Sequence, residues 1–143
     1  MIGRICGILA AKHPAALGTD FLDAVEWVSV NKPAGTPAVA NASLTFRAHV
    51  PAVERALERS ISHGIPWVIA AGNDNLDACD QSAGSRVGRA IVVGATNSQD
   101  AEAGFSNHGR CVDLYAPGVQ IASAFIHSAA LGTGIHMQGT SMA

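Results

Sequence analysis

Two apolar runs with almost no polar interruption restrict the fold of this 143-residue chain more than any other feature. They are residues 65–71 (IPWVIAA) and 90–96 (AIVVGAT). Strands that are apolar at successive positions, and not only at alternate ones, are typical of a parallel sheet covered on both faces. We therefore expect a parallel β-sheet with helices packed against it.

Segments with helical periodicity stand before and between these candidate strands. Residues 18–32 carry apolar side chains at helical spacing, behind a possible cap at Thr19 or Asp20. Residues 50–64 have one apolar and one charged face, and the final Gly of that segment is placed to end a helix. This alternation predicts the α/β class, with a partial, mostly parallel β-sheet flanked by helices. Shorter apolar runs predict further strands at 38–44, 111–118 and 120–125.

The charge content bears on possible partners. Only 14% of residues are charged, and the formal net charge is −2, without a basic stripe. No apolar stretch approaches the roughly 20 residues that a membrane-spanning helix needs. We expect no nucleic-acid partner and no membrane insertion. A hydrophobic content of 48% in a chain of this length fits one folded domain.

Small and polar residues follow two of the candidate strands. Ser43 follows one strand, and Gly72, Asn73 and Asp74 follow the run at 65–71. In parallel α/β sheets, functional groups collect at the carboxyl ends of the strands. The sequence therefore predicts a functional site where these ends meet.

Nucleotide binding and zinc binding are both disfavoured. The Gly-rich run 132–139 (GTGIHMQG) misses the G-x-G-x-x-G spacing, and no G-K-[ST] motif is present. The six histidines form no H-E-x-x-H motif, and the cysteines show no paired spacing, so no zinc site is expected. Nucleophilic catalysis remains as the chemistry to consider.

Ser141 and Asn73 are the two candidates for that chemistry. Ser141 lies between small residues in GTSMA, where a Ser is more often a helix cap than a nucleophile. If a helix began at Ser141, its dipole would favour an oxyanion beside the hydroxyl. Asn73, in AAGNDN, offers an amide that can donate to an oxyanion, although Gly-Asn is more often a turn. Together, on an α/β fold, the two are more specific than either alone.

Four stretches resemble the subtilases, the subtilisin-like serine peptidases, and among them the proteinase K-like branch. The resemblance covers residues 20–143, whereas residues 1–19 match poorly. It implies a subtilisin-like fold and a C-terminal fragment of the catalytic domain, which we expect to be truncated at both ends. The stretches are PAVANASL, GIPWVIAAGNDNLDAC, AIVVGATNSQDAEAGFSNHGRCVDLYAPGVQIASA and GTSMA.

The resemblance implies a role for each residue of the candidate site. Ser141 would be the nucleophile, and Asn73 would donate to the oxyanion beside the backbone N–H of Ser141. In subtilisin itself, loss of this Asn donor was measured to lower kcat by about 10²–10³-fold. The substrate-binding residues would be Ser43, Leu44, Ala70, Ala71, Gly72 and Thr140.

One wall of the substrate site departs from the family pattern. The family usually has Ser-Leu-Gly-Gly where this chain reads Ser43-Leu44-Thr45-Phe46. Glycines there let an extended substrate pair with the backbone and enter the pocket. Thr45 and Phe46 place side chains in that region, so we expect a changed substrate preference.

The resemblance also implies a disulfide bond. Cys79 and Cys111 match the positions of a disulfide in some proteinase K-like members, which leaves Cys6 as a free thiol. A disulfide points to an oxidising compartment, so we expect a secreted, extracellular protein.

A structural calcium site is implied as well, although the chemistry requires no cofactor. Relatives hold calcium through an Asp and backbone carbonyls, and hard cations take such oxygen ligands. The corresponding residues are Asp113, Gly88 and Ala90.

The partners of the nucleophile do not appear in the sequence. The family carries its catalytic Asp and His in Asp-Thr/Ser-Gly and His-Gly-Thr-His motifs, and neither is present. We expect the intact protein to be a monomeric serine endopeptidase that cleaves peptides through an acyl-enzyme on Ser141. We expect this chain alone to be inactive. The alternative is a non-catalytic, subtilase-derived pseudoenzyme or interaction module that ends at Ala143.

Overall fold

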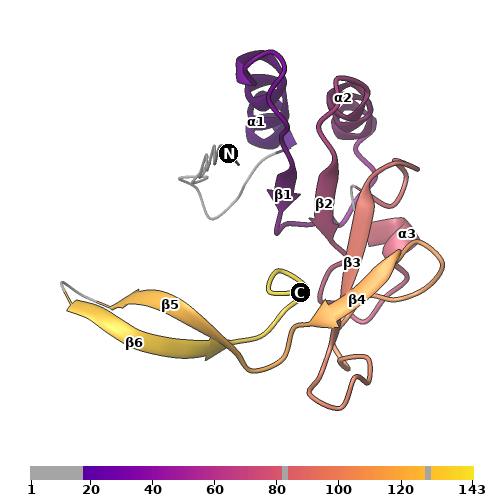
Figure 1. Cartoon of the computed structure of the whole chain (residues 1–143). Coiled ribbons are helices and arrows are strands. Elements are labelled where there is room, and N and C mark those ends of the chain that lie inside the picture. The colour runs from indigo at the N-terminus through magenta and orange to yellow at the C-terminus, as the bar shows by residue number, and fades with distance from the viewer. Residues whose placement is uncertain (1–17, 82–83, 128–129) are drawn as a thin grey trace.

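The computed structural model describes residues 18–81, 84–127 and 130–143 (Figure 1). Most of the segment expected at 1–19, including Cys6, lies outside the described residues, so the predicted boundary after residue 19 stays a prediction. The elements in chain order are α1 (Gly18–Asn31), β1 (Ala40–Ala42), α2 (Pro51–Ser62), β2 (Trp67–Ala70), α3 (Ala78–Gln81), β3 (Ile91–Thr96), β4 (Leu114–Pro117), β5 (Ile121–His127) and β6 (Ala130–Met137).

The central feature is a parallel four-stranded sheet in the order β1-β2-β3-β4. The register pairs Asn41 with Val68, Val68 with Ile91, and Val93 with Leu114. The predicted parallel α/β fold is therefore confirmed. Because all four strands run the same way, their carboxyl ends lie on one side, where the C-terminal turn also lies (Figure 1).

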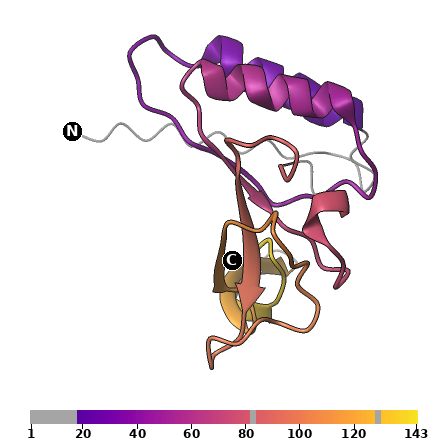
Figure 2. The same ribbon diagram turned by 90° about the vertical axis from the view of Figure 1, so that its right-hand side faces the viewer.

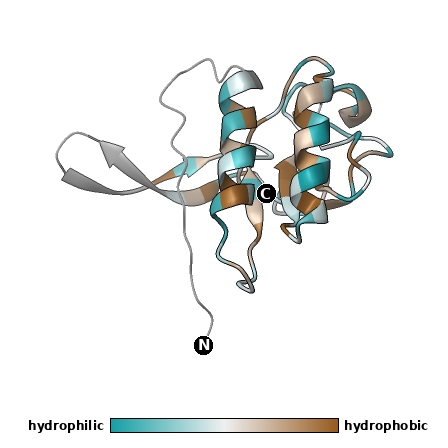
Figure 3. Ribbon diagram, turned by 90° about the horizontal axis from the view of Figure 1, so that it is seen from above, coloured by the Kyte–Doolittle hydropathy of each residue, from teal (hydrophilic) through white to brown (hydrophobic). Residues whose placement is uncertain are grey.

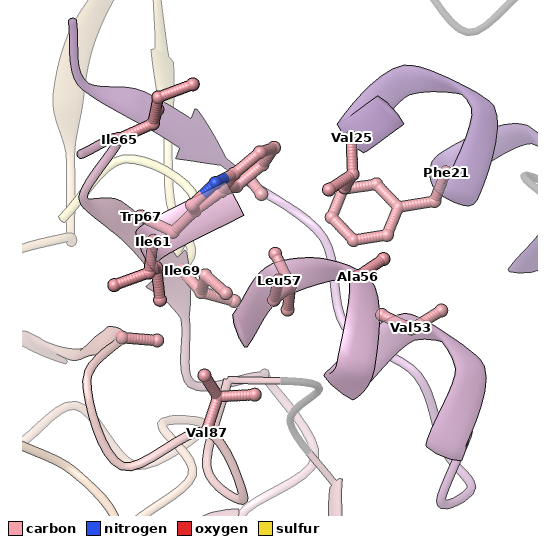
Figure 4. Packing of buried hydrophobic residues seen from close by; sticks show 12 residues of the cluster. Phe21, Val25, Val53, Ala56, Leu57, Ile61, Ile65, Trp67, Ile69 and Val87 are labelled. Atoms are coloured by element: carbon pink, nitrogen blue, oxygen red, sulfur yellow. The ribbon is translucent and has the colours of Figure 1, made fainter. Parts of the chain in front are cut away.

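Helices α1 and α2 lie side by side against one part of the sheet (Figures 1 and 2). Their buried faces meet the apolar strands in one core, with Leu57 at 0% exposure (Figure 4). The Phe21 ring meets Trp67 edge to face, and the Trp67 Nε1–H donates to Ser60 Oγ at 2.9 Å. Most charged residues of both helices are exposed, and the hydropathy colouring shows hydrophilic stretches on both helices (Figure 3). This core fixes β1 and β2, and hence the loops that follow them.

Two elements differ from the sequence-based expectation. The run 38–44 was expected to be a buried strand, but in β1 only Ala42 is buried and Asn41 is exposed. Within the described residues β1 has a neighbour on one side only, which explains the exposure. The Gly-rich run 132–139, considered above only as a possible nucleotide-binding motif, is mostly strand β6, which pairs antiparallel with β5 in a projecting hairpin (Figure 1). Because glycine has no side chain, the glycines of this run interrupt the alternation of apolar and polar residues that is typical of a strand.

No helix in the described part of the chain is long and apolar enough to cross a bilayer.

The short helix α3, which the sequence does not predict, carries Cys79. Cys79 forms a disulfide with Cys111 across a separation of 32 residues, with the Cα atoms 5.1 Å apart. The structure thus contains the bond that the family resemblance implied.

Replacing Cys79 and Cys111 together by Ser is expected to lower the free energy of unfolding by about 3–4 kcal/mol, the chain-entropy value for a loop of this size. Urea unfolding followed by circular dichroism measures the difference. Dithiothreitol should destabilise the parent chain and leave the double variant unchanged. A loss below about 1 kcal/mol would contradict a stabilising role for this bond, since native bridges contribute about 2–4 kcal/mol.

Candidate active site

Three loops meet at the carboxyl side of the sheet. They are residues 43–47 after β1, residues 72–77 after β2, and the C-terminal turn 139–142 (Figure 1). Because parallel strands end on the same side of a sheet, the sequence predicts that Ser43 and Asn73 come together. The structure brings both residues into one hydrogen-bonded cluster with the C-terminal turn.

Ser141 lies exposed in a single turn and not at the start of a helix. The Met142 N–H donates to the Gly139 carbonyl at 3.1 Å, which closes the turn. The Gly139 N–H donates to the Gly118 carbonyl at 2.8 Å, which fastens the turn to the residue after β4. Within the described residues, no helix begins at Ser141.

Ser43 and Ser141 bind each other reciprocally. The Ser43 Oγ–H donates to the Ser141 carbonyl at 3.0 Å, and the Ser141 Oγ–H donates to the Ser43 carbonyl at 3.3 Å. Among the described residues, no His ring forms a hydrogen bond with Ser141. In the part of the chain that the structure describes, the nucleophile candidate thus has a carbonyl partner but no general base.

The Asn73 amide is held in one orientation by Thr140. The Thr140 N–H and the Thr140 Oγ–H donate to Asn73 Oδ1 at 2.8 and 3.0 Å. Two donors on one atom identify it as the oxygen of the amide, so Nδ2 is the other atom. In the described part of the chain, Nδ2 has no hydrogen-bond partner, and Asn73 is exposed. An oriented amide donor therefore faces solvent beside the turn of Ser141.

Thr140 connects this donor to the wall formed by the end of β2. It is 3% exposed, and its Oγ accepts the Gly72 N–H at 3.1 Å. Ala70 and Ala71, which precede Gly72 in the chain, are also buried, at 6% and 0% exposure. The roles of these residues in substrate binding stay a prediction.

Asn107 is a residue that sequence reasoning missed. It is fully buried, and its Oδ1 accepts the backbone N–H groups of Asp74 and Leu76, each at 3.0 Å. Its Nδ2 donates to the Ala71 carbonyl at 2.9 Å, and its own N–H donates to the Gly72 carbonyl at 2.9 Å. Asn107 therefore fixes the loop that carries Asn73. Its stretch FSNHG was part of the family resemblance, but nothing in the sequence distinguished this Asn from a surface residue.

The side chains of residues 43–46, the loop that departs from the family pattern, lie in different surroundings. Leu44 and Phe46 pack against the hydrophobic core, and the Phe46 and Phe21 rings lie 5.6 Å apart. The expectation that Phe46 places its side chain in the substrate region is therefore wrong. Thr45 Cγ2 lies 3.4 Å from the position that a Cβ on Gly72 would occupy, so Thr45 lies beside the loop that follows β2. The role of Leu44 in substrate binding stays a prediction.

Asp113 lies where β4 approaches the start of β3. Its Oδ2 accepts the Val92 N–H at 2.7 Å, and its own N–H donates to the Val92 carbonyl at 2.9 Å. Gly88 and Ala90 precede β3 in a turn closed by the Ala90 N–H and the Val87 carbonyl at 2.9 Å. Among the described residues, no three His, Cys, Asp or Glu side chains gather as a metal site. A cation here would thus depend on the second Asp113 oxygen and on backbone carbonyls, a donor set that suits calcium.

Comparison with known proteins identifies the family to which this chain is similar. The model of the subtilase family matches residues 5–143. The "Extracellular serine proteinase" of Thermus sp. (strain Rt41A) is 48% identical over 119 residues, which are 83% of this chain and 28% of that protein. The "Alkaline serine exoprotease A" of Vibrio alginolyticus is 44% identical over 119 residues, again 83% of this chain and 21% of that protein.

A solved structure agrees with the sequence relatives. The crystal structure of a cold-adapted subtilisin-like serine proteinase superposes with a TM-score of 0.73 at 41% sequence identity. The match covers 85% of this chain and 41% of the other. The chain thus spans less than half of the proteins it resembles, and its match to the family model extends over nearly its whole length. The chain belongs to the subtilase family.

Proposed function

We propose that this chain is the part of a serine endopeptidase that carries the nucleophile Ser141 and the oxyanion donor Asn73. The observation that carries the proposal is the orientation of the Asn73 amide. Thr140 occupies Oδ1 with two donors, which leaves Nδ2 exposed beside the turn of Ser141. A binding module has no need of a preorganised amide donor next to an exposed Ser. The relatives are named proteinases, which supports the same reaction.

The chemistry follows from these groups. Ser141 Oγ would form a bond to the carbonyl carbon of a peptide, and the carbonyl π electrons would move onto its oxygen. The proton of Oγ would pass to a His, as the triad mechanism requires. Asn73 Nδ2 and the Ser141 N–H would donate to the new oxyanion. Collapse of that intermediate would expel the amine, which takes the proton from the same His, and water would then release the acyl group from Ser141.

The chain by itself is expected to show no peptide or ester turnover, because no base among the described residues is positioned to take the Ser141 proton. The purified 143-residue chain can be assayed with a chromogenic peptide and a peptide ester. Ser141→Ala should leave the background rate unchanged. Turnover that this substitution abolishes would contradict the expectation and would identify a base within the chain.

A chimera tests the function itself. The 119 aligned residues of the Thermus proteinase are replaced by those of this chain, so that the catalytic Asp and His come from the relative. Hydrolysis of a peptide by the folded chimera is expected if Ser141 and Asn73 are competent. A folded but inactive chimera would favour the alternative of a non-catalytic pseudoenzyme or interaction module.

Localisation, partners and oligomeric state complete the proposal. The whole protein would be secreted, because it carries a disulfide and one relative is named extracellular. Its partners would be protein or peptide substrates, and it would act as a monomer. No cofactor would take part in the chemistry. A structural calcium ion would be held by a carboxylate oxygen of Asp113 and the carbonyl oxygens of Gly88 and Ala90.

Calcium is expected to raise the melting temperature of the chain, because a ligand that binds only the folded state stabilises it by mass action. Free calcium at 100 times its Kd would add about 2.7 kcal/mol. Asp113→Asn should abolish this increase, whereas Asp100→Asn, an exposed Asp in another loop, should retain it. Thermal unfolding in calcium, in magnesium and in a chelator measures the effect. An equal increase in the Asp113→Asn variant would refute the site.

A further inference from the structure

The side chain of Asn107 binds the backbone on both sides of Asn73. Before Asn73 in the chain, the Asn107 Nδ2 donates to the Ala71 carbonyl at 2.9 Å. After Asn73, the Asn107 Oδ1 accepts the N–H groups of Asp74 and Leu76, each at 3.0 Å. Asn107 is fully buried, whereas Asn73 is exposed. One buried amide therefore brackets the residue that carries the candidate oxyanion donor.

Asn107 is itself fixed to the interior strand β3 of the sheet. The Oγ–H of the neighbouring Ser106 donates to the Asn107 carbonyl at 2.9 Å, and the same Oγ accepts the N–H of Ala95 in β3 at 3.0 Å. The Asn107 N–H donates to the Gly72 carbonyl at 2.9 Å. Ser106 and Asn107 are both 0% exposed, so these hydrogen bonds lie in a medium of low dielectric, which strengthens them. The loop that carries Asn73 is thus held to the sheet through buried groups.

The Asn73 amide therefore has two anchors with different tasks. Thr140 donates twice to Asn73 Oδ1, at 2.8 and 3.0 Å, and these bonds fix the rotation of the amide group. The place of the Asn73 Cα follows instead from the backbone bonds made by Asn107 on either side. An oxyanion donor acts only within about 2.7–3.1 Å of the oxygen that it stabilises. A loop shift of about 1 Å would therefore remove much of the effect of the donor.

We propose that Asn107 is a positioning residue for the oxyanion donor, and that it acts on the reaction only through Asn73, by holding the backbone on both sides of that residue. This role rests on the proposed function, because it requires the Asn73 amide to be the donor. A residue that only stabilises the fold would affect the whole chain alike when it is replaced. A positioning residue would affect Asn73 and its partner Thr140 first, and this difference can be measured without turnover.

Amide hydrogen exchange of the full chain, followed by NMR, provides the first measurement. The Thr140 N–H reports on Asn73, because it donates to Asn73 Oδ1, whereas the N–H of the adjacent Gly139 donates to the Gly118 carbonyl. In Asn107→Ala, the Thr140 amide is expected to exchange at least about tenfold faster, because its hydrogen bond opens locally. The exchange rate of the Gly139 amide should change by less than about twofold. Equal acceleration of both amides would show a purely structural role and would overturn the proposal.

Two matched variants separate positioning from folding. Asn107→Asp has the shape of Asn and keeps an oxygen acceptor, but as a carboxylate it cannot donate to the Ala71 carbonyl. It should accelerate exchange selectively at Thr140, and it decides the question if Asn107→Ala does not fold. Ser60→Ala removes an equally buried hydrogen bond from the core, the one that Trp67 Nε1–H donates to Ser60 Oγ, and should leave the ratio of the Thr140 and Gly139 rates unchanged. A ratio that changes as much in Ser60→Ala would refute positioning by Asn107.

The chimera with the Thermus proteinase provides the second measurement. Asn107→Ala is expected to lower kcat by about 10²-fold with little change in KM, since a misplacement of 1 Å costs about that much. In an Asn73→Ala background, the same substitution should lower kcat no further, because its effect passes through the missing amide. An equal loss in both backgrounds would overturn the role of Asn107 and leave the peptidase proposal intact. A parent chimera that folds without turnover would refute the peptidase function, and the role of Asn107 in the reaction with it.

Discussion

In the chimera with the Thermus proteinase, Ser141→Ala is expected to lower kcat by about 10⁶-fold, and Asn73→Ala by about 10²–10³-fold. Both magnitudes were measured on subtilisin, a member of the same family, and are carried over to this chain. The difference between them has a physical reason. Loss of Ser141 removes the nucleophile, while loss of Asn73 removes one of two oxyanion donors and leaves the Ser141 N–H.

The structure makes the Asn73 part of this expectation specific. Asn73→Asp keeps an acceptor for the two Thr140 donors but replaces Nδ2 by a carboxylate oxygen, which repels an oxyanion. It should lower kcat at least as much as Asn73→Ala while KM changes little. Asn31→Ala, an exposed Asn on α1, serves as the control and should leave kcat unchanged. Retention of full kcat in Asn73→Ala would show that Nδ2 does not act on the oxyanion.

The sheet could be predicted from the sequence because its signal is local. The runs 65–71 and 90–96 are apolar at successive positions, and they became β2 and β3 at the centre of the sheet. Strand β6 gave no such signal, because Gly132 and Gly134 contribute no side chain to an alternating pattern. Strand β6 is defined by its antiparallel pairing with β5, and this pairing is visible only in the structure.

The site could be predicted only in part, for a different reason. Ser141 and Asn73 stand in short motifs that a family resemblance identifies, and strand direction places Ser43 near them. The roles of Asn107 and of the alternation at 44–46 depend on contacts between residues distant in sequence. Asn107 meets the 72–77 loop from more than 30 positions away, and Phe46 meets Phe21 in the core. No local pattern carries such contacts, so only the structure shows which side chains face the core and which face the site.

Gly72 is the backbone position on which the site depends most, and Gly72→Ala is expected to cost about 5 kcal/mol of unfolding free energy or to leave the chain unfolded. Its φ is 111°, a conformation that L-residues rarely adopt, and an added Cβ would lie 2.2 Å from Asn107 Nδ2. Backbone strain contributes about 1–2 kcal/mol. Overpacking adds about 1–3 kcal/mol, and each buried hydrogen bond lost with Asn107 adds about 1 kcal/mol.

Gly64→Ala separates strain from the steric clash. Gly64 also has a positive φ, 80°, but nothing lies within 4 Å of its Cβ position. This variant should therefore lose only about 1–2 kcal/mol, the cost of the backbone conformation. Urea unfolding followed by circular dichroism, with the disulfide intact, compares the two variants. A Gly72→Ala chain no less stable than Gly64→Ala would show that the loop accommodates a side chain.

A double-mutant cycle then tests whether the Cβ added at position 72 clashes with the side-chain amide of Asn107. If the clash with the Asn107 amide dominates, Gly72→Ala should cost much less in an Asn107→Ala background, because the amide is no longer there to be displaced. Strictly additive losses would instead assign the cost to the backbone conformation alone. The cycle matters for function, since Asn107 holds Asp74 and Leu76 on either side of Asn75 and so sets the position of the Asn73 amide donor.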